Sequence, residues 1–468
     1  MKIEQLYTSC LAEATYYVES AGEVAIIDPL RATEPYIKMV EKNGAKIKYI
    51  LETHFHADFV SGHIDLAEKT GARIVFGPTA VPEFDAYIAK DNEILELGNV
   101  KIKVLHTPGH TLESSTFLLI DENGKDRAIF TGDTLFIGDV GRPDLAVKTD
   151  LSREDLAGFL FDSLHSKILP LADDVIVYPG HGAGSACGKN MSKETVDTLG
   201  HQKQLNYALR NISKAEFIAE VTDGLVAPPQ YFPKNAVMNK RGYASFDDIL
   251  SKGIRPLSID EFLVFREKND ALILDTRKKE AFAEAHIPGS WYIGIEDNFA
   301  PWIGALIQHL NQPIIFLADE GQEEEVVTRM SRVGYDNALG YLKGGIKTWV
   351  EAGYTTEKLE QISAEAFAVK YETEKVNILD VRRKSEFDSE HISGAENLPL
   401  DFIFENLSMV NHDKKYFIHC AGGYRSVIAS SILQAKGFQN IVNIVGGFKA
   451  LSRTNLPKSE YLLQKSML

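Results

Sequence analysis

The stretch "LETHFHADFVSGH" (residues 51–63) places His54, His56 and Asp58 two residues apart, directly after a strand-like run. Three side chains that can bind a metal within five residues predict a metal site on one loop. Imidazole and carboxylate groups without a thiolate suit zinc, iron or manganese. The apolar Phe59 follows them, so the loop raises the question of how many metals it holds and whether the chemistry is hydrolysis.

Further candidate ligands also follow predicted strands. The runs "EVAIID", "IKYILET", "ARIVFG", "KIKVLHT", "RAIFTGD" and "DVIVYPG" are β-rich and end in turn residues, and patterns such as "SREDLAGFLFDSLHSKIL" have helical spacing. His110, Asp133 and His181 each come just after one of these strands. Because layered α/β folds collect ligand sites at one end of their strands, we expect these side chains beside the 51–63 loop.

The bulk properties limit the possible partners. At 468 residues the chain predicts about three domains. A net charge of −16 disfavours nucleic acid or an anionic membrane surface as a partner. No apolar run approaches the roughly 18 residues of a membrane span. The chain has three cysteines, an odd and small number that does not indicate a disulfide framework. We therefore expect a cytoplasmic protein.

An internal repeat organises the second half. "ILDTRKKEAFAEAHIPGS" starts at residue 273 and "ILDVRRKSEFDSEHISGA" at residue 378, which predicts two copies of one α/β domain. Before them, "GLVAPPQYFPKNAVMNKRGYASF" carries three prolines and little periodicity, as in a linker. The predicted parts are a first domain at 1–227, a linker at 228–257, and domain copies at 258–357 and 358–468.

The last copy contains "YFIHCAGGYRS", in which four residues separate Cys420 from Arg425. A glycine-rich loop that enters a helix points backbone N–H groups inward and favours an anion. We expect Gly422, Gly423 and Tyr424 to form this cradle, which with Arg425 would stabilise a nucleophilic thiolate or a persulfide at Cys420.

The middle copy carries no such chemistry. Ala318 occupies the position of the nucleophile and Glu323 that of Arg425, and the acidic run "EEE" would repel an anion. We expect a spacer or docking domain.

Two cysteines remain. Cys187, in "GHGAGSACGKN", lies six residues after His181 and is either a small buried residue or a reactive thiol at the mouth of the metal site. Cys10 has no supporting context and is expected to be structural.

These motifs resemble two known families. "THFHAD", "TPGHT", "GDTLF" and "PGHG" resemble the glyoxalase II-like branch of the metallo-β-lactamase superfamily, whereas the Cys-x₄-Arg loop, "DVRRKSEF" and "GGFKAL" resemble rhodanese sulfurtransferases. The resemblance implies an αβ/βα sandwich followed by two rhodanese-like α/β domains. In the glyoxalase II-like branch the loop ends in a histidine and holds two metals. Phe59 stands in place of that histidine, which disfavours a binuclear zinc hydrolase.

The same superfamily includes persulfide dioxygenases, and "GDTLFIGDVGRPDL" (132–145) is similar to that subfamily. This resemblance implies that His54, His110 and Asp133 hold one Fe(II), a two-histidine, one-carboxylate set with open positions for substrate and O₂. His56, Asp58 and His181 would then support these ligands or serve an alternative metal. Arg142 and Asp144 would lie near the site, Arg142 facing an anionic substrate, unless the pair is an exposed turn salt bridge.

The expected function is oxidation of a low-molecular-weight thiol persulfide by O₂ to sulfite and thiol, coupled to sulfur transfer at Cys420 that makes or uses thiosulfate. Cys187 and Arg425 are expected to take part in catalysis. The thiol could be glutathione, coenzyme A or bacillithiol, and a homo-oligomer is compatible with the sequence. One alternative is a zinc-dependent thiolester hydrolase of the glyoxalase II type fused to a rhodanese, and another is a persulfide carrier or sensor with a vestigial metal site.

Overall fold

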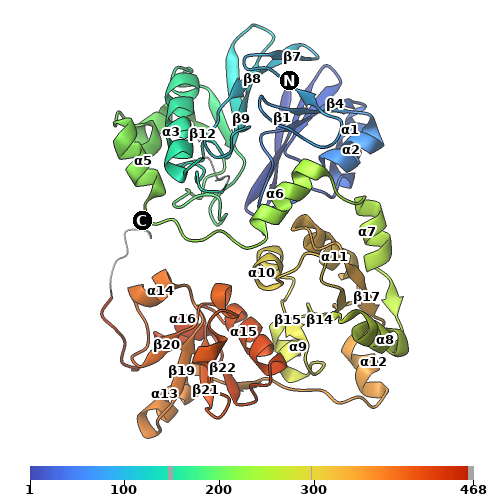
Figure 1. The fold of residues 1–468 in the computed structure, drawn as a ribbon, viewed down its shortest axis with the longest axis vertical. Coiled ribbons are helices and arrows are strands. Elements are labelled where there is room, and N and C mark those ends of the chain that lie inside the picture. Colours follow the sequence, from blue (N-terminus) through green and yellow to red (C-terminus); the bar gives the residue numbers. More distant parts are fainter. Residues whose placement is uncertain (146–150, 297, 462–468) are drawn as a thin grey trace. The chain divides into compact units, whose positions relative to one another are not determined.

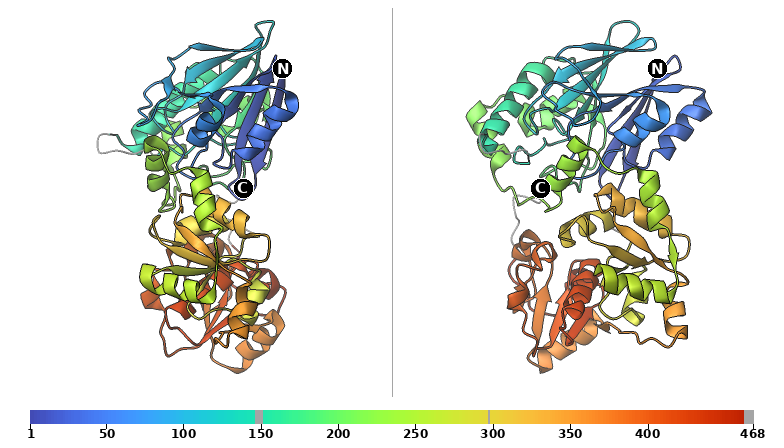
Figure 2. Two further views of the ribbon diagram at one scale, coloured as in Figure 1. Left: turned by 90° about the vertical axis from the view of Figure 1, so that its right-hand side faces the viewer. Right: turned by 45° about the vertical axis from the view of Figure 1, so that its right-hand side comes forward.

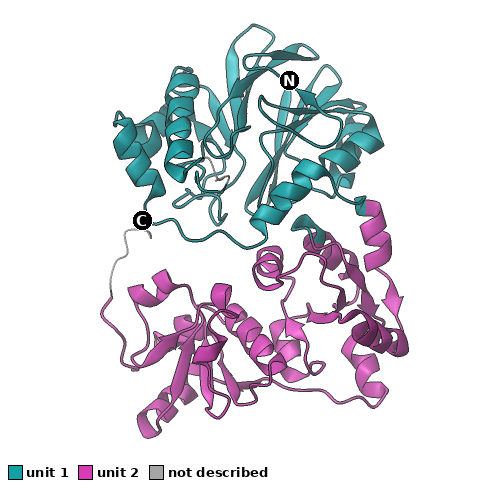
Figure 3. Ribbon diagram, viewed as in Figure 1, with its two compact units in different colours: residues 1–246, 331–334 teal, residues 247–330, 335–468 magenta. Residues whose placement is uncertain are grey.

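A computed structural model describes residues 1–145, 151–296 and 298–461. By contacts, the chain divides into two compact units (Figure 3). The first contains Met1–Phe246 with Ser331–Gly334, and the second contains Asp247–Met330 with Tyr335–Leu468. In the part of the chain that the structure describes, no helix is long and apolar enough to cross a membrane.

The first unit contains two six-stranded sheets (Figure 1). One has the order β1 (Lys2–Thr8), β2 (Glu13–Ser20), β3 (Glu23–Ile27), β4 (Lys46–Glu52), β5 (Arg73–Phe76) and β6 (Tyr87–Ile88). The other has the order β12 (Asp197–Thr198), β11 (Ile176–Pro179), β10 (Asp126–Gly132), β9 (Ser115–Ile120), β8 (Val100–His106) and β7 (Ile94–Leu97).

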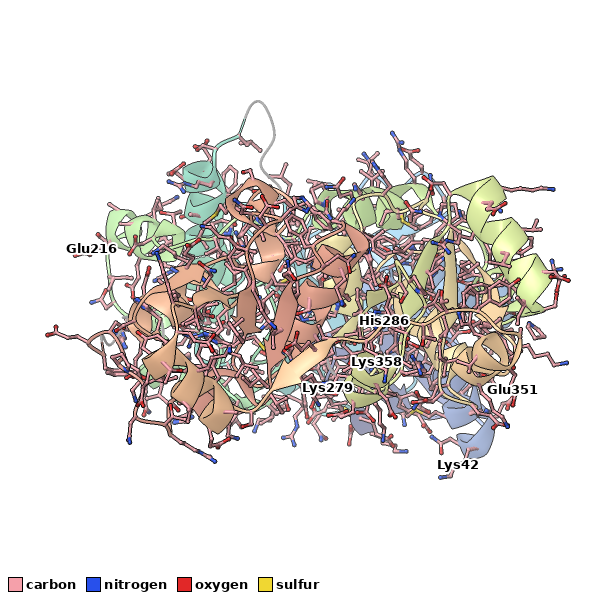
Figure 4. The ribbon with its side chains drawn as sticks, turned by 90° about the horizontal axis from the view of Figure 1, so that it is seen from below. Lys42, Glu216, Lys279, His286, Glu351 and Lys358 are labelled. Carbon is pink, nitrogen blue, oxygen red and sulfur yellow. The ribbon has the colours of Figure 1, made fainter. Side chains whose placement is uncertain are left out.

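The helices of this unit cover the outer faces of the two sheets. The first sheet carries α1 (Glu34–Asn43) and α2 (His63–Thr70). The second carries α3 (Arg153–Ser163), a π-helical turn (Leu164–Ile168), α4 (Leu199–Leu205), a 3₁₀ turn (Tyr207–Leu209) and α5 (Lys214–Thr222). Helix α5 begins at a capping box in which Ser213 and Glu216 satisfy each other's backbone N–H; Glu216 is labelled in Figure 4.

Three apolar layers hold the first unit together. Residues such as Val18, Leu51 and Phe117 fill the space between the sheets, and separate clusters lie under the helices, around Leu66 on one side and Leu160 on the other. This confirms the αβ/βα sandwich. Each predicted strand run in this domain is a strand.

The second unit contains the two predicted domain copies, each built on a five-stranded parallel sheet (Figure 2). The first sheet has the order β13-β17-β16-β14-β15 and the second β18-β22-β21-β19-β20, so the two topologies are the same. Both copies also keep one ion pair at the same place, Arg277 on Asp275 and Arg382 on Asp380, each at 2.6 Å. The two sequence repeats therefore have the same fold.

The elements of the middle copy are β13 (Pro256–Leu257), α8 (Ile259–Asn269), β14 (Leu272–Asp275), α9 (Lys279–Glu284), β15 (Trp291–Tyr292), α10 (Phe299–Leu306), β16 (Ile314–Leu317), α11 (Glu323–Arg332), β17 (Ala338–Leu342) and α12 (Gly345–Glu351).

Those of the last copy are β18 (Glu360–Ile362), α13 (Ala364–Thr373), β19 (Asn377–Asp380), α14 (Lys384–Ser389), β20 (Ala395–Asn397), two 3₁₀ turns (Leu400–Phe402, Leu407–Met409), β21 (Tyr416–His419), α15 (Tyr424–Ala435), β22 (Ile441–Ile444) and α16 (Gly447–Leu451).

The segment 228–257 differs from the irregular linker expected. It contains α6 (Phe232–Arg241), α7 (Phe246–Gly253) and β13, and α6 belongs to the first unit. Pro233 lies in the first turn of α6, where its missing N–H costs no hydrogen bond. A proline that looked like a helix breaker therefore begins a helix.

Candidate active sites

The metal set that the family resemblance implies, three of the candidate ligands predicted at the strand ends, comes together in the first unit. His54 follows β4, His110 follows β8 and Asp133 follows β10. One ligand atom from each lies within 4.8 Å of the others. The Oδ2 atom of Asp133 is 3.5 Å from His110 Nε2 and 4.0 Å from His54 Nε2. All three side chains are buried, so they face one another away from solvent.

Glycines allow this approach. Gly132 precedes Asp133 at φ +48°, and a Cβ there would lie 2.4 Å from Thr53 Oγ1. A Cβ on Gly180 would lie 2.9 Å from Asp133 Oδ1. Since a side chain at either position would clash, only glycine lets the ends of β10 and β11 meet the 51–63 loop.

Hydrogen bonds fix which nitrogen each histidine presents. Thr53 Oγ1 donates to Asp28 Oδ2 at 2.8 Å and therefore accepts from His54 Nδ1 at 2.9 Å. His110 Nδ1 donates to the carbonyl of Arg142 at 2.9 Å. Both rings thus carry their proton on Nδ1 and offer a free lone pair on Nε2, as metal-binding histidines do.

The donor atoms fit a divalent metal. In the described part of the chain, His54 Nε2 and Asp133 Oδ2 are buried and have no hydrogen-bond partner, which is costly unless a cation is bound between them. Burial lowers the pKa of His54 well below its usual value, and its neutral ring can bind a metal. Although burial opposes it, the neighbouring His181 and His110 hold the pKa of Asp133 well below its ordinary value.

His56 points elsewhere, although it is the central residue of the sequence motif. Its Nε2 lies 3.1 Å from Asp28 Oδ1 and 3.5 Å from Glu52 Oε2. Burial alone would lower the pKa of His56, but these carboxylates outweigh burial and raise it well above its usual value. His56 therefore lies in a buried ion network with Asp28 and Glu52, apart from the set of His54, His110 and Asp133.

Asp58 and His181 lie behind Asp133. His181 Nδ1 is 2.7 Å from Asp133 Oδ1, and its Nε2 is 2.7 Å from Asp58 Oδ2. Against the effect of burial, the carboxylates of Asp133 and Asp58 raise the pKa of His181 well above its usual value. His181 thus holds Asp133 in place and leaves Asp133 Oδ2 for the metal.

Cys187 lies beside this pair, with its sulfur within 4.8 Å of ligand atoms of Asp58 and His181. Burial, followed by the two carboxylates of Asp58 and Asp133, raises the pKa of the Cys187 thiol well above its usual value. The sequence left open whether Cys187 is a small buried residue or a thiol at the metal site. In the structure it is buried and also lies beside Asp58 and His181.

Arg142 differs from the expected substrate contact. Its guanidinium binds Asp144 through two hydrogen bonds of 2.7 Å and also donates to the carbonyls of Ala186 and Val226. It is 4% exposed, so the pair is not an exposed turn salt bridge either. With its backbone N–H on the carbonyl of Cys187 and its own carbonyl on His110, Arg142 joins the Cys187 segment to a metal ligand.

Asn239 is a site residue that the sequence did not reveal. From α6, its Nδ2 donates to the carbonyls of His56 and Phe59 at 2.7 Å, and its Oδ1 accepts from the N–H of Ser61. It holds the metal loop from the segment that looked like a linker. Asp28 and Glu52 were missed for a similar reason, since isolated carboxylates carry no motif.

The second site lies in the last domain copy, where Cys420 follows β21. Its Sγ accepts the N–H of Gly423 at 3.1 Å and lies 3.7 Å from Ser426 Oγ. Gly447, at φ +56°, passes so close that a Cβ would be 2.3 Å from the carbonyl of Cys420. The loop therefore directs one backbone N–H, that of Gly423, at the sulfur.

We expected Arg425 to point at the sulfur of Cys420. Its guanidinium instead forms two hydrogen bonds with Glu386, at 2.7 and 2.9 Å. Glu386 lies on α14, immediately after the Asp380–Arg382 pair. Arg425 thus anchors the start of α15 to α14, and the Gly423 N–H makes the direct contact with Cys420.

The middle copy contacts this loop. Tyr424 Oη donates to the carbonyl of Gly294 at 2.7 Å, and the N–H of Tyr292 donates to Ser431 Oγ on α15 at 2.9 Å. In the corresponding loop of the middle copy, Glu323 Oε2 accepts the N–H of Gly321 at 2.9 Å. A carboxylate thus accepts a loop N–H that could otherwise bind an anion.

Comparison with known proteins places both halves in families. The metallo-beta-lactamase superfamily matches residues 9–181, and the rhodanese-like domain matches residues 258–352 and 363–454. Hydroxyacylglutathione hydrolase GloC of Haemophilus influenzae is 33% identical over 187 residues, covering 35% of this chain and 82% of the relative. Human mitochondrial persulfide dioxygenase ETHE1 is 28% identical over 220 residues, covering 46% and 78%.

A crystal structure of a metallo-beta-lactamase from Staphylococcus aureus subsp. aureus COL is 32% identical, with a TM-score of 0.64, and covers 73% of this chain and 98% of its own. The chain therefore belongs to the metallo-beta-lactamase superfamily, in its glyoxalase II and ETHE1-like group, and continues into tandem rhodanese domains.

Proposed function

We propose that the first domain oxidises a low-molecular-weight thiol persulfide with O₂ at a single Fe(II), and that Cys420 of the last domain transfers sulfane sulfur. The observation that carries the proposal is the separation of His56 from the metal set. The glyoxalase II-like loop that holds two metals ends in a histidine where this chain has Phe59, and here His56 also lies against Asp28 and Glu52. Two imidazoles and one carboxylate remain.

His54, His110 and Asp133 would hold the metal. When bound, Fe(II) would supply open coordination positions at which a persulfide and O₂ can meet. Thr53 and the Arg142 carbonyl accept hydrogen bonds from the two Nδ1 atoms and so aim the two Nε2 atoms at the metal position, and His181 keeps Asp133 Oδ1 occupied. The nearly complete burial of the three ligands keeps bulk water away from the reacting sulfur.

The overall reaction balances as RSSH + O₂ + H₂O → RSH + sulfite + two protons. The terminal sulfur loses four electrons, which reduce O₂, and the S–S bond breaks to release the thiol. Cys187, beside Asp58 and His181, is the candidate acceptor or relay of sulfane sulfur at this site.

At Cys420, the sulfur attacks a sulfane sulfur atom and becomes a persulfide as the donor leaves. Sulfite then attacks the outer sulfur, the new S–S bond gives thiosulfate, and the Cys420 thiolate is released. Gly422, Gly423 and Tyr424 form the cradle, and the Gly423 N–H stabilises negative charge on sulfur in each state. The same steps in reverse would use thiosulfate.

The second candidate is a zinc-dependent thiolester hydrolase fused to a rhodanese. It is favoured by the similarity to hydroxyacylglutathione hydrolases, such as the one from Haemophilus influenzae. In that case metal-activated water would attack the thiolester.

The deciding experiment is anaerobic purification, metal analysis and O₂ uptake with the persulfides of glutathione, coenzyme A and bacillithiol. We expect one iron per chain and uptake of one O₂ per sulfite formed. Zinc content, no O₂ uptake and rapid thiolester cleavage would support the hydrolase instead. C420S should abolish thiosulfate:thiol exchange and leave O₂ uptake intact, with C10S as the matched cysteine control.

A further inference from the structure

A cavity of about 580 Å³ lies between the two domain copies of the second unit. The middle copy lines it with the C-terminal ends of α8 and α10 and with the start of β14, and the last copy adds Phe404 and the end of α15. Small-molecule sites have volumes of roughly 300–1,000 Å³ and often lie where two domains meet. The size and the position of the cavity therefore suit a small ligand.

The cavity is separate from the Cys420 site, although α15 reaches both. This helix begins at Tyr424, in the Cys420 loop, and Ala435 and Lys436 at its other end line the cavity. Since the helix has 12 residues, its two ends are about 18 Å apart. A ligand in the cavity would therefore be an additional molecule and not the sulfur substrate of Cys420.

One aromatic ring from each copy forms part of the cavity wall. Trp291 and Phe404 stack with their ring centroids 5.5 Å apart and their planes inclined by 27°. Among the residues that the structure describes, the indole N–H of Trp291 has no hydrogen-bond partner. Because indole is a donor only, this wall offers a ligand apolar surface and one free donor.

Charged side chains of both signs line the same cavity. The cations are Arg266 and Lys436, and the carboxylates are Glu267 and Asp270. Within the described ranges of the chain, none of the four forms an ion pair within 4 Å, so each keeps its charge free for a ligand. A ligand with charge of one sign would be repelled by half of this set, whereas a ligand with carboxylate and ammonium groups can pair with all of it.

We propose that the cavity binds a zwitterionic molecule derived from amino acids, such as a short peptide. Its carboxylates would pair with the two cations and its ammonium group with the two carboxylates of the wall, and its uncharged part would lie against the Trp291 ring. Because the wall comes from both copies, the bound ligand would hold them together. The middle copy, which has no nucleophile, thus contributes a binding site, and this site does not depend on the proposed function.

The test uses the full-length protein and S-methylglutathione, a zwitterionic tripeptide derivative whose blocked sulfur cannot form a persulfide. All three tryptophans of the chain lie in the middle copy, and only Trp291 lines the cavity, so tryptophan fluorescence reports binding there. Wild type should show a saturable change with a dissociation constant below about 1 mM. W291F should lose this change.

Variants of the charged wall test the pairing. R266Q and E267Q should each weaken binding at least tenfold, because each removes the partner of one charge on the ligand. K268Q changes an exposed residue of the same helix that lies outside the cavity wall, and it should bind as wild type does. The diethyl ester of the ligand, which keeps the ammonium group and lacks both carboxylates, should bind at least tenfold more weakly.

No saturable change in wild type would overturn the proposal, as would equal affinities of R266Q, E267Q and K268Q or equal affinities of the ligand and its ester. A change that survives in W291F would place the ligand elsewhere and would also overturn it. H54A, which removes a metal ligand of the first domain, should keep the fluorescence change. The outcome is therefore independent of O₂ uptake, which tests the proposed function alone.

Discussion

The ring of Phe59 stacks on the ring of His56, with centroids 4.2 Å apart and planes inclined by 30°. On its other side, His56 meets the carboxylates of Asp28 and Glu52. Phe59 thus bears on two features of the loop, because it stands where the glyoxalase II-like motif has a histidine and its ring packs against His56 beside the ion network. The motif "HFHAD" resembles that of a two-metal site, but its second histidine lies against Asp28 and Glu52, outside the set of His54, His110 and Asp133.

Replacing the two histidines of the motif should have different effects on metal binding. H54A removes a ligand whose Nε2 faces Asp133, so we expect loss of bound metal. H56Q removes a group that supports the ligands, and such changes weaken metal affinity about 10–100-fold. The number of metal ions bound per chain at saturation should stay the same. Metal content after anaerobic dialysis checks both. Equal loss of metal in the two variants would mean that His56 is itself a ligand.

The Arg142–Asp144 pair should act on stability and metal retention. R142K cannot make the two-pronged contact with Asp144 and leaves the carbonyls of Ala186 and Val226 without their donor. Breaking a buried pair on one side costs about 3 kcal/mol of unfolding free energy, measured by urea denaturation. Metal should also dissociate faster, because the Arg142 carbonyl orients His110.

The exposed pair of Arg153 and Glu154 provides the control, since both side chains are about half exposed. R153K should change the unfolding free energy by less than about 0.5 kcal/mol. If R142K instead raised only the KM for the persulfide at unchanged stability, Arg142 would be a substrate-binding residue, as its sequence position suggested.

The sequence was sufficient where local pattern determines placement. His54, His110 and Asp133 could be placed near one another without coordinates, because each follows a β-rich run and strand ends converge, while the family resemblance singled them out from the other candidate ligands. The repeat located Ala318 and Glu323 in the same way, by register alone. Both inferences depend on periodicity and spacing, which a single chain displays directly.

Contacts between segments that are far apart in the chain could not be predicted from the sequence. Asn239 supports the metal loop from a helix more than 175 positions away in the chain, and nothing in "FPKNAVMNKR" marks that contact. The orientation of Arg425 is also a tertiary matter, because Glu386 competes for it from another helix. Which carboxylate pairs with an arginine depends on which one lies nearest in the folded chain, and the spacing of residues along the sequence does not show this.

The middle copy should support the active loop of the last copy. Y424F removes the hydrogen bond from Tyr424 to the Gly294 carbonyl, which is worth about 0.5–1.5 kcal/mol. We expect a lower kcat for thiosulfate:thiol exchange, because the start of α15 is less firmly held, with O₂ uptake unchanged. Y416F is the matched control, since Tyr416 Oη accepts a bond from Asn411 within the same copy. An equal fall in exchange for both variants would argue against a role of the middle copy.

Titration of His286 in the middle copy (Figure 4) should contribute to the pH dependence of the unfolding free energy. This ring is buried, stacks on Phe282 and donates from Nδ1 to the Phe282 carbonyl. Burial lowers the pKa of His286 below its usual value near 6.5. Between the two pKa values the unfolded chain binds more protons than the folded chain, so the stabilisation is present above about pH 6.5 and is lost as the pH falls.

The expected result is an unfolding free energy that decreases from pH 7.5 to pH 5.5, with a contribution from this ring of at most about 1.4 kcal/mol per pH unit. H286Q keeps a donor for the Phe282 carbonyl but cannot titrate, so its profile should be flatter. Urea denaturation at several pH values measures the difference, and H309Q, at an exposed histidine, should leave the slope unchanged. If the profile of H286Q has the slope of wild type, His286 does not carry the acid sensitivity of this domain, and other buried rings such as His419, whose pKa burial also lowers, must account for it.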